Sequence, residues 1–310
     1  MSDLQLSQLI DEQSPDAVWE EVKAVLSAYL SEEDWLPLAA AFTNVVDLYE
    51  GRYDGYRACN TPYHDLRHIT DVFLALARLI HGSLLDGFAL DGRSIALALS
   101  AALFHDSGLI QSSDDTDGTG AKYLADHDQR SLRLMRVYGR KSGWSESEIE
   151  AGCFLISCTD LSRAVAEIAY PSATFEHLGK LLAAADLIAQ MADRVYLEKL
   201  LYLYHEFKEG GIGNYTGEVD LLRKTIGFYQ LVDQRLSAIA EMIDRLARRH
   251  FAARWSMDVN LYQAAIDNQK EYLHFILDQP GDPRTHLRRQ DIVQKVHQTY
   301  GNSESPLPNS

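Results

Sequence analysis

Residues 94–108 read SIALALSAALFHDSG, and the fold prediction starts from this stretch. Its first eleven residues are almost entirely apolar, which suits a buried helix, but the next two are His105 and Asp106. An imidazole and a carboxylate at the end of a buried helix are unfavourable unless they pair or bind a metal ion. Gly108 is well placed to end the helix. The stretch therefore predicts a buried helix that carries a polar functional group at its end.

The rest of the chain shows the same periodicity, with apolar residues at three- and four-residue steps. Glycine and proline separate these segments, and we find neither an alternating strand pattern nor an internal repeat. We predict an all-α fold, a single-domain multi-helix bundle with its metal site between helices. The predicted helices span 16–30, 33–49, 65–82, 93–106, 120–138, 145–158, 174–191, 193–208, 218–250 and 258–277.

The domain is expected to cover residues 15–280, after an N-terminal segment of residues 1–14. Residues 281–310 are expected to form a C-terminal helix and tail. The end of this tail, GNSESPLPNS (301–310), has the composition of a disordered segment.

Composition narrows the function classes. The 310 residues include 29 basic and 45 acidic ones, a net charge of −16, which disfavours binding to nucleic acid and to anionic membranes. The N-terminus lacks a secretory signal, and the apolar stretches are too short to span a bilayer. The cysteines Cys59, Cys153 and Cys158 form no CxxC motif and suggest reduced thiols. We therefore expect a cytoplasmic protein.

Three further motifs place polar residues beside apolar helical segments. In Tyr63-His64-Asp65-Leu66-Arg67-His68, the two histidines are four apart and share one helix face. Thr159-Asp160-Leu161-Ser162 follows an apolar run. Asp186 lies in KLLAAADLIAQM, where a single carboxylate among alanine, leucine and isoleucine requires a cation or a hydrogen-bond donor.

Together these motifs supply the ligands of a metal site, namely His68, His105, Asp106 and Asp186. Two imidazoles and two carboxylates suit Zn, Mn, Fe or Co and leave positions open for water. A bound metal ion makes hydroxide available at neutral pH and neutralises phosphate oxygens. His64, one turn before a ligand, could protonate a leaving oxygen.

Each residue alone has an ordinary explanation. A histidine on an apolar face is usually a satisfied core residue, and an aspartate in an alanine-rich helix often caps a helix or forms an ion pair. The ordered set is more specific than any of its members. His127 and Asp128, at the start of a predicted helix, could support the ligands or contribute to a second metal position. We expect structural roles for the remaining histidines, His81, His177, His205, His250, His274, His286 and His297.

This ordered set resembles the signature of the HD superfamily of metal-dependent phosphohydrolases. Within that superfamily, the chain is similar to the catalytic domain of class I cyclic-nucleotide phosphodiesterases. The resemblance runs from about residue 60 to about residue 278 and rests most specifically on the metal ligands. Its other marks are residues 63–68, Thr159-Asp160-Leu161-Ser162, Ile226-Gly227-Phe228 and Asp267-Asn268-Gln269-Lys270-Glu271-Tyr272.

The resemblance implies a first metal ion on His68, His105, Asp106 and Asp186. Asp106 would bridge to a second ion of the Mg or Mn type, so one firm site and a second are expected. His64 would be the general acid, acting with Asp106 in catalysis. The substrate would contact Tyr63, Thr225 and Phe228, with Phe228 against the base. Asp65, His127, Asp128 and Asp160 would support these residues.

The chain also departs from the family pattern. Asp65 stands where an asparagine is usual, and Ser107-Gly108-Leu109 replaces a further aspartate and a His-Pro-Gly. Thr225 replaces the glutamine that reads the purine edge, and a single hydroxyl cannot make that bidentate contact. The resemblance therefore supports the hydrolysis of a phosphoester in general more strongly than the hydrolysis of a cyclic nucleotide in particular.

Three functions remain open from the sequence. The first is hydrolysis of a nucleotide or cyclic nucleotide, and the second is phosphomonoesterase activity on nucleoside monophosphates or another small phosphate. The third is a catalytically degenerate binding or scaffold protein. The expected partner is a small-molecule phosphoester, with no nucleic acid and no membrane. The helices at 193–208 and 218–250 either form a homodimer interface or pack into the core.

Overall fold

Helix α3 (Leu66–Leu85) lies at the centre of the fold. Asp65 caps it by accepting a hydrogen bond from the backbone N–H of His68 at 2.9 Å, and 15 of its 20 residues are buried. It packs against α1 (Pro15–Leu26), α4 (Gly92–Phe104), α7 (Ala173–Ala192) and α10 (Ala240–Trp255). Its length and apolarity would allow it to span a membrane, but 83% of the apolar window is buried within the protein. These apolar side chains therefore form the core.

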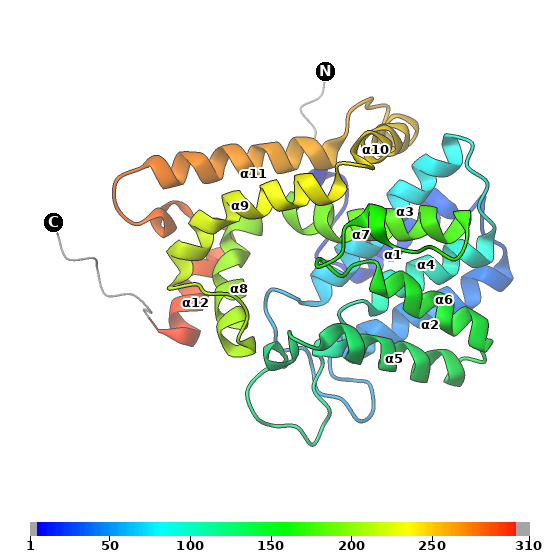
Figure 1. Cartoon of the computed structure of the whole chain (residues 1–310), viewed down its shortest axis with the longest axis horizontal. Helices are drawn as coiled ribbons and strands as arrows, with labels where there is room; N and C mark the ends of the chain where they lie inside the picture. The colour runs from blue at the N-terminus through cyan, green and yellow to red at the C-terminus, as the bar shows by residue number, and fades with distance from the viewer. Residues whose placement is uncertain (1–4, 302–310) are drawn as a thin grey trace.

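The computed structural model describes residues 5–301, and over this range the chain is all-helical with no β-strand. Figure 1 shows α1–α7 on one side and α8, α9, α11 and α12 on the other, with α10 along the top. Buried hydrophobic residues from both groups form one continuous core. The remaining helices are α2 (Glu32–Tyr49), α5 (His127–Lys141), α6 (Glu146–Ser157), α8 (Tyr196–Gly210), α9 (Glu218–Leu236), α11 (Leu261–Asp278) and α12 (Ile292–Tyr300).

Short 3-10 helices connect several of these elements. They are η1 (Leu6–Gln8), η2 (Ser107–Leu109), η3 (Gly120–Tyr123), η4 (Val165–Glu167), η5 (Pro283–His286) and η6 (Arg289–Asp291). The all-α prediction is confirmed. The predicted disorder concerns residues that, apart from Gly301, lie outside the described part of the chain.

Two predicted helix boundaries were wrong. The segment 218–250 forms two helices, because the backbone leaves the helical conformation at Ile239 (φ −124°, ψ 0°). This break keeps Leu236, Ile239 and Ile243 buried while α10 packs against α3. No glycine or proline marks the position, so the sequence pattern could not reveal it. The segment 120–138 begins with the 3-10 turn η3, and its α-helix starts only at His127.

Helices α3 and α10 approach each other most closely at Gly82. A Cβ atom at this position would lie 2.0 Å from the carbonyl oxygen of Leu246, whereas a Cβ at Gly227 in α9 would meet open space.

We expect Gly82→Ala to lower the free energy of unfolding by about 1–3 kcal/mol, because the two helices must separate. Gly227→Ala should leave it unchanged or raise it by up to about 1 kcal/mol, because alanine favours a helix over glycine. Urea denaturation of both variants measures the difference. Equal effects of the two substitutions would show that the packing of α3 on α10 does not limit stability.

Candidate metal centre

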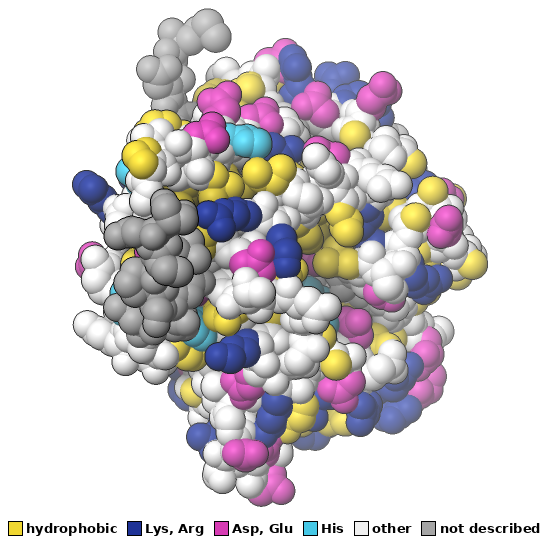
Figure 2. Space-filling view, turned by 60° about the vertical axis from the view of Figure 1, so that its left-hand side comes forward, with side chains coloured by type: hydrophobic (Ala, Val, Ile, Leu, Met, Phe, Trp, Pro, Cys, Tyr) yellow, Lys and Arg dark blue, Asp and Glu magenta, His cyan; other side chains and the backbone are white. Residues whose placement is uncertain are grey.

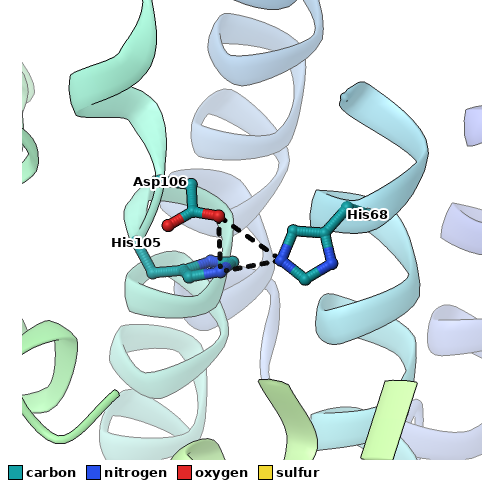
Figure 3. A group of neighbouring side chains, drawn as sticks. All are labelled: His68, His105 and Asp106. Carbon is teal, nitrogen blue, oxygen red and sulfur yellow. Dashed lines mark hydrogen bonds and ion pairs between the residues drawn. The ribbon is translucent and has the colours of Figure 1, made fainter. Parts of the chain in front are cut away.

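The side chains of His68, His105, Asp106 and Asp186 converge at one buried point, and we call these four residues the ligand cluster. They come from α3, from the junction of α4 with η2, and from α7. Nε2 of His68 lies 3.3 Å from Nε2 of His105 and 3.4 Å from a carboxylate oxygen of Asp106 and of Asp186. Figure 3 shows the two imidazoles and Asp106 pointing toward one another.

The distances from the two imidazole nitrogens to their neighbours in the cluster fit metal coordination. His105 Nε2 lies 3.4 Å from Asp106 Oδ2 and 3.6 Å from Asp186 Oδ1. Ligand atoms about 2.0–2.2 Å from one ion lie roughly 3–3.5 Å apart when they are neighbours in its coordination shell. The five measured separations, 3.3–3.6 Å, match this range closely.

The two carboxylates approach the imidazole pair from different sides. The ligand atoms of His68, His105 and Asp106 all lie within 4.8 Å of one another, and Asp186 falls outside this tight group although it reaches both imidazoles. Two ligand atoms that bind one ion at about 2.0–2.2 Å lie at most about 4.4 Å apart, so Asp186 would have to move toward Asp106 before both carboxylates could hold the same ion. His68, Asp106 and Asp186 all face the pocket described below.

Local backbone structure orients the imidazoles. His105 is the C-cap of α4, where carbonyl groups lack helical partners, and its Nδ1 donates to the carbonyl of Ala102 at 2.8 Å. This bond leaves Nε2 free to bind a metal ion. The His105 side chain is 1% exposed, so it contributes to the cluster from behind the pocket.

In the absence of a metal ion, the two carboxylates favour the protonated form of the imidazoles. Burial opposes the charged form of His68, but Asp106 and Asp186 outweigh it and raise the pKa of His68. Against the same burial, these two carboxylates raise the pKa of His105 well above its usual value. In turn, although burial acts the other way, the histidines hold the carboxyl pKa values of Asp106 and Asp186 well below their usual value.

The second oxygen of Asp106 faces a different histidine. Asp106 Oδ1 lies 3.5 Å from Nε2 of His127, and this nitrogen is 3.3 Å from Asp128. Nδ1 of His127 donates to the carbonyl of Leu124 at 2.8 Å, which fixes the ring with Nε2 toward the carboxylates. Burial opposes the charge on His127, but Asp106 and Asp128 raise its pKa to about 9. Asp106 thus connects two groups of ligand atoms.

His64 has a partner that the sequence analysis missed. Its Nδ1 lies 2.6 Å from an oxygen of Glu206 in α8, whose other oxygen accepts the backbone N–H of Tyr63 at 2.6 Å. Because a carboxylate accepts hydrogen bonds, Nδ1 carries the proton, and Nε2 is the nitrogen left for a ligand. Glu206 is 142 residues away from His64, so no local motif could have indicated the pair.

The ligand cluster opens into a cavity of about 430 Å³. One side of the cavity is polar and carries His64, His68, Asp106, His127, Asp128, Thr159, Asp160 and Asp186. The other side comes from α8 and α9, and we call it the apolar wall: Leu200, Leu203, Phe207, Leu221, Phe228 and Leu231. The metal ligands therefore face a pocket large enough for a small organic ligand.

The three predicted substrate-binding residues all line this cavity. Tyr63 is buried, and its hydroxyl donates to Gln190 at 2.7 Å. The hydroxyl of Thr225 donates to the carbonyl of Leu221 in its own helix at 2.9 Å. Phe228 lies on the apolar wall, three residues further along α9.

The remaining predicted residues have clear structural partners. Asp65 caps α3 and forms an ion pair with Lys199 at 3.1 Å, so it holds the helix start that carries His68. Asp160 accepts the backbone N–H of Ser162 at 2.9 Å and also faces the cavity.

Comparison with known proteins adds a partial match. A family model described as Npun_R2479-like matches residues 147–247, which run from α6 to the middle of α10. No curated protein matches the chain. The matched segment contains Asp186, Thr225 and Phe228 but not His68, His105 or Asp106. The chain is therefore similar to this family over the side of the pocket that carries the apolar wall.

The raised pKa of His127 predicts a pH effect in the metal-free protein. The unfolded side chain has a pKa near 6.5 and the folded one about 9. Its ion pairs therefore contribute fully below pH 6.5, and the contribution is lost as the pH rises through 9. The contribution amounts to at most about 3 kcal/mol.

Thermal denaturation from pH 6 to pH 9.5 in the presence of a chelator measures this effect. We expect the stability of the wild type to fall over this interval and that of His127→Gln to fall less. The control is His274→Gln, which changes an exposed histidine on α11 outside the cluster and should follow the wild type. If the stability of His127→Gln fell with pH as steeply as that of the wild type, His127 would not be the source of the pH dependence.

Proposed function

We propose that the protein is a metal-dependent hydrolase of a small-molecule phosphoester. The observation that carries this proposal is the convergence of two imidazoles and two carboxylates at separations of 3.3–3.6 Å beside an open cavity. A purely structural cluster would not need to face a pocket of this size. The resemblance of the sequence motifs to those of HD-superfamily phosphohydrolases is consistent with it.

The charge of the cavity supports a metal requirement. Four carboxylates line it, and among the described lining residues Lys224 is the one lysine or arginine. Lys224 already pairs with Asp220 at 2.9 Å and with the carbonyl of Asn214 at 2.7 Å. A phosphate group would be repelled from such a site unless cations offset the carboxylates.

We propose that the ligand cluster would hold one metal ion, Zn, Mn or Fe, and that Asp106 and His127 would help to hold a second, of the Mg or Mn type. The support for the second position is that the two oxygens of Asp106 face different histidines. When bound, such ions supply Lewis acidity that activates water and offsets charge on the phosphate.

The chain itself supplies the proton for the leaving group. Glu206 holds the Nδ1–H of His64, so a protonated His64 presents Nε2–H as the donor to the departing oxygen. The carboxylate of Glu206 also stabilises the imidazolium that forms before the transfer. Tyr63 shares Glu206 through its backbone N–H and so keeps this pair at the cavity wall.

The sequence leaves two substrate classes open, nucleotides or cyclic nucleotides and other small phosphomonoesters, and both are to be tested side by side. The free cysteines Cys59, Cys153 and Cys158 are consistent with a reducing compartment, and we place the activity in the cytoplasm. A binding or scaffold protein is the second candidate, because Ser107-Gly108-Leu109 replaces metal-supporting residues of the family.

Metal content tests the centre directly. We expect elemental analysis of the purified protein, reloaded with Mn or Zn, to find one or two metal ions per chain. Asp106→Ala should lose most of the metal, because Asp106 contacts both histidine groups. Asp267→Ala, which changes an exposed carboxylate on α11, should retain it. A reloaded wild type without metal would favour the scaffold function.

The role of His64 as the general acid is tested on the metal-loaded protein. We expect His64→Ala to keep the metal and to lose about 10²–10⁴-fold in kcat. Glu206→Gln should keep the metal and lose less activity than His64→Ala. His274→Ala serves as the control. Unchanged turnover in His64→Ala would falsify the role of His64 while leaving the metal centre in place.

A further inference from the structure

The cavity is divided into two chemically different halves. The polar half comes from α3 and the loop before it, α5, α7, the junction that follows α4 and the loop that follows α6, whereas the apolar wall comes from α8 and α9. A phosphoester whose phosphate occupies the polar half must place its organic group against the apolar wall. The chemistry of that wall therefore decides which organic group fits.

Three polar side chains of the cavity, Thr225, Thr159 and Gln190, already have partners within the protein. Thr225 donates its hydroxyl to the carbonyl of Leu221, and Thr159 donates its own to the carbonyl of Ile156 at 2.8 Å. Gln190 accepts from Tyr63 at 2.7 Å and donates to the carbonyl of Asp186 at 3.3 Å.

Gln190 is the one side-chain amide among the described lining residues, and none of them is an asparagine or arginine. Bidentate reading of an adenine edge requires a side chain with a free donor and a free acceptor, such as an amide. No side chain of this type is free beside the wall.

The mouth of the cavity is also apolar. Leu161 and Leu231 line it and are 46% and 48% exposed, so two large hydrophobic side chains remain open to water there. Figure 2 brings the side with α8 and α9 forward and shows hydrophobic side chains between scattered charges of both signs. An alkyl or aryl group in the cavity would cover Leu161 and Leu231, and the burial of this apolar surface would favour binding.

We propose that the site selects phosphoesters whose organic group is apolar, either alkyl or aryl, and that it binds this group by burial and not by hydrogen bonds. This inference rests on the proposed function for the placement of the phosphate. Affinity should then grow with the apolar area of the ligand, by about fourfold for each methylene that becomes buried. A nucleoside phosphate gains less, since its base and ribose bring polar groups that the wall does not satisfy.

The test separates binding from turnover. Dissociation constants of ethyl-, butyl-, hexyl- and octylphosphonate are measured by calorimetry on the Mn-loaded full chain, because phosphonates bind without being hydrolysed. We expect the affinity to rise about fourfold per methylene until the cavity is filled, with a negative heat-capacity change of binding. Adenosine monophosphate should bind less tightly than hexylphosphonate.

Two variants test whether the apolar wall causes the dependence of affinity on chain length. Leu203→Ser and Leu231→Ser, each on the apolar wall, should weaken octylphosphonate binding more than ethylphosphonate binding and so reduce the dependence of affinity on chain length. Leu36→Ser is the matched control, since Leu36 lies on α2, is 76% exposed and does not line the cavity. It should reproduce the wild-type series.

Hydrolysis of the matching alkyl phosphates distinguishes the two proposals. Chain-length-dependent binding without any hydrolysis would overturn the proposed function and keep the inference about the ligand. Hydrolysis of phosphoesters with no dependence on chain length, or with a clear preference for nucleotides, would overturn the inference and keep the function.

Discussion

The structure depends on the burial of two carboxylates and two imidazoles at one point between α3, α4 and α7. Each carboxylate alone would be expensive to bury, and Asp106 and Asp186 would repel each other without a cation between them. The imidazoles of His68 and His105 resolve this conflict with protons in the metal-free protein, and a metal ion would resolve it more fully. Metal binding should therefore displace protons and strengthen as the pH rises.

The same constraint explains which parts of the site the sequence could predict. His105-Asp106 and Asp186 stand out because each interrupts an apolar helical run, and that anomaly is local. Periodicity likewise identified the all-α fold and most of the helices. His127 could be suspected from its position at the start of a helix, and the structure brings it within 3.5 Å of Asp106.

Features that depend on long-range packing could not be predicted in this way. Glu206 lies in an amphipathic helix where a glutamate is unremarkable, and only the fold brings it to His64. The end of α9 carries no helix-breaking residue, so the break at Ile239 follows from the way α10 packs against α3. The apolar wall could not be predicted either, because its leucines follow ordinary helical periodicity whether they face the core or a cavity.

The departure after Asp106 also has a structural explanation. A Cβ atom at Gly108 would lie 2.1 Å from the carbonyl oxygen of His127, so only glycine allows α5 to begin this close to the ligand cluster. The backbone N–H of Gly108 donates to the hydroxyl of Ser131 at 2.9 Å, and its carbonyl accepts from Arg130 at 2.6 Å. These contacts fasten α5 to the segment after Asp106 and bring His127 beside the carboxylate. The chain thus lacks the polar residues that a resemblance to the HD superfamily would predict directly after the His-Asp pair, but it supplies an imidazole to the same carboxylate from the next helix.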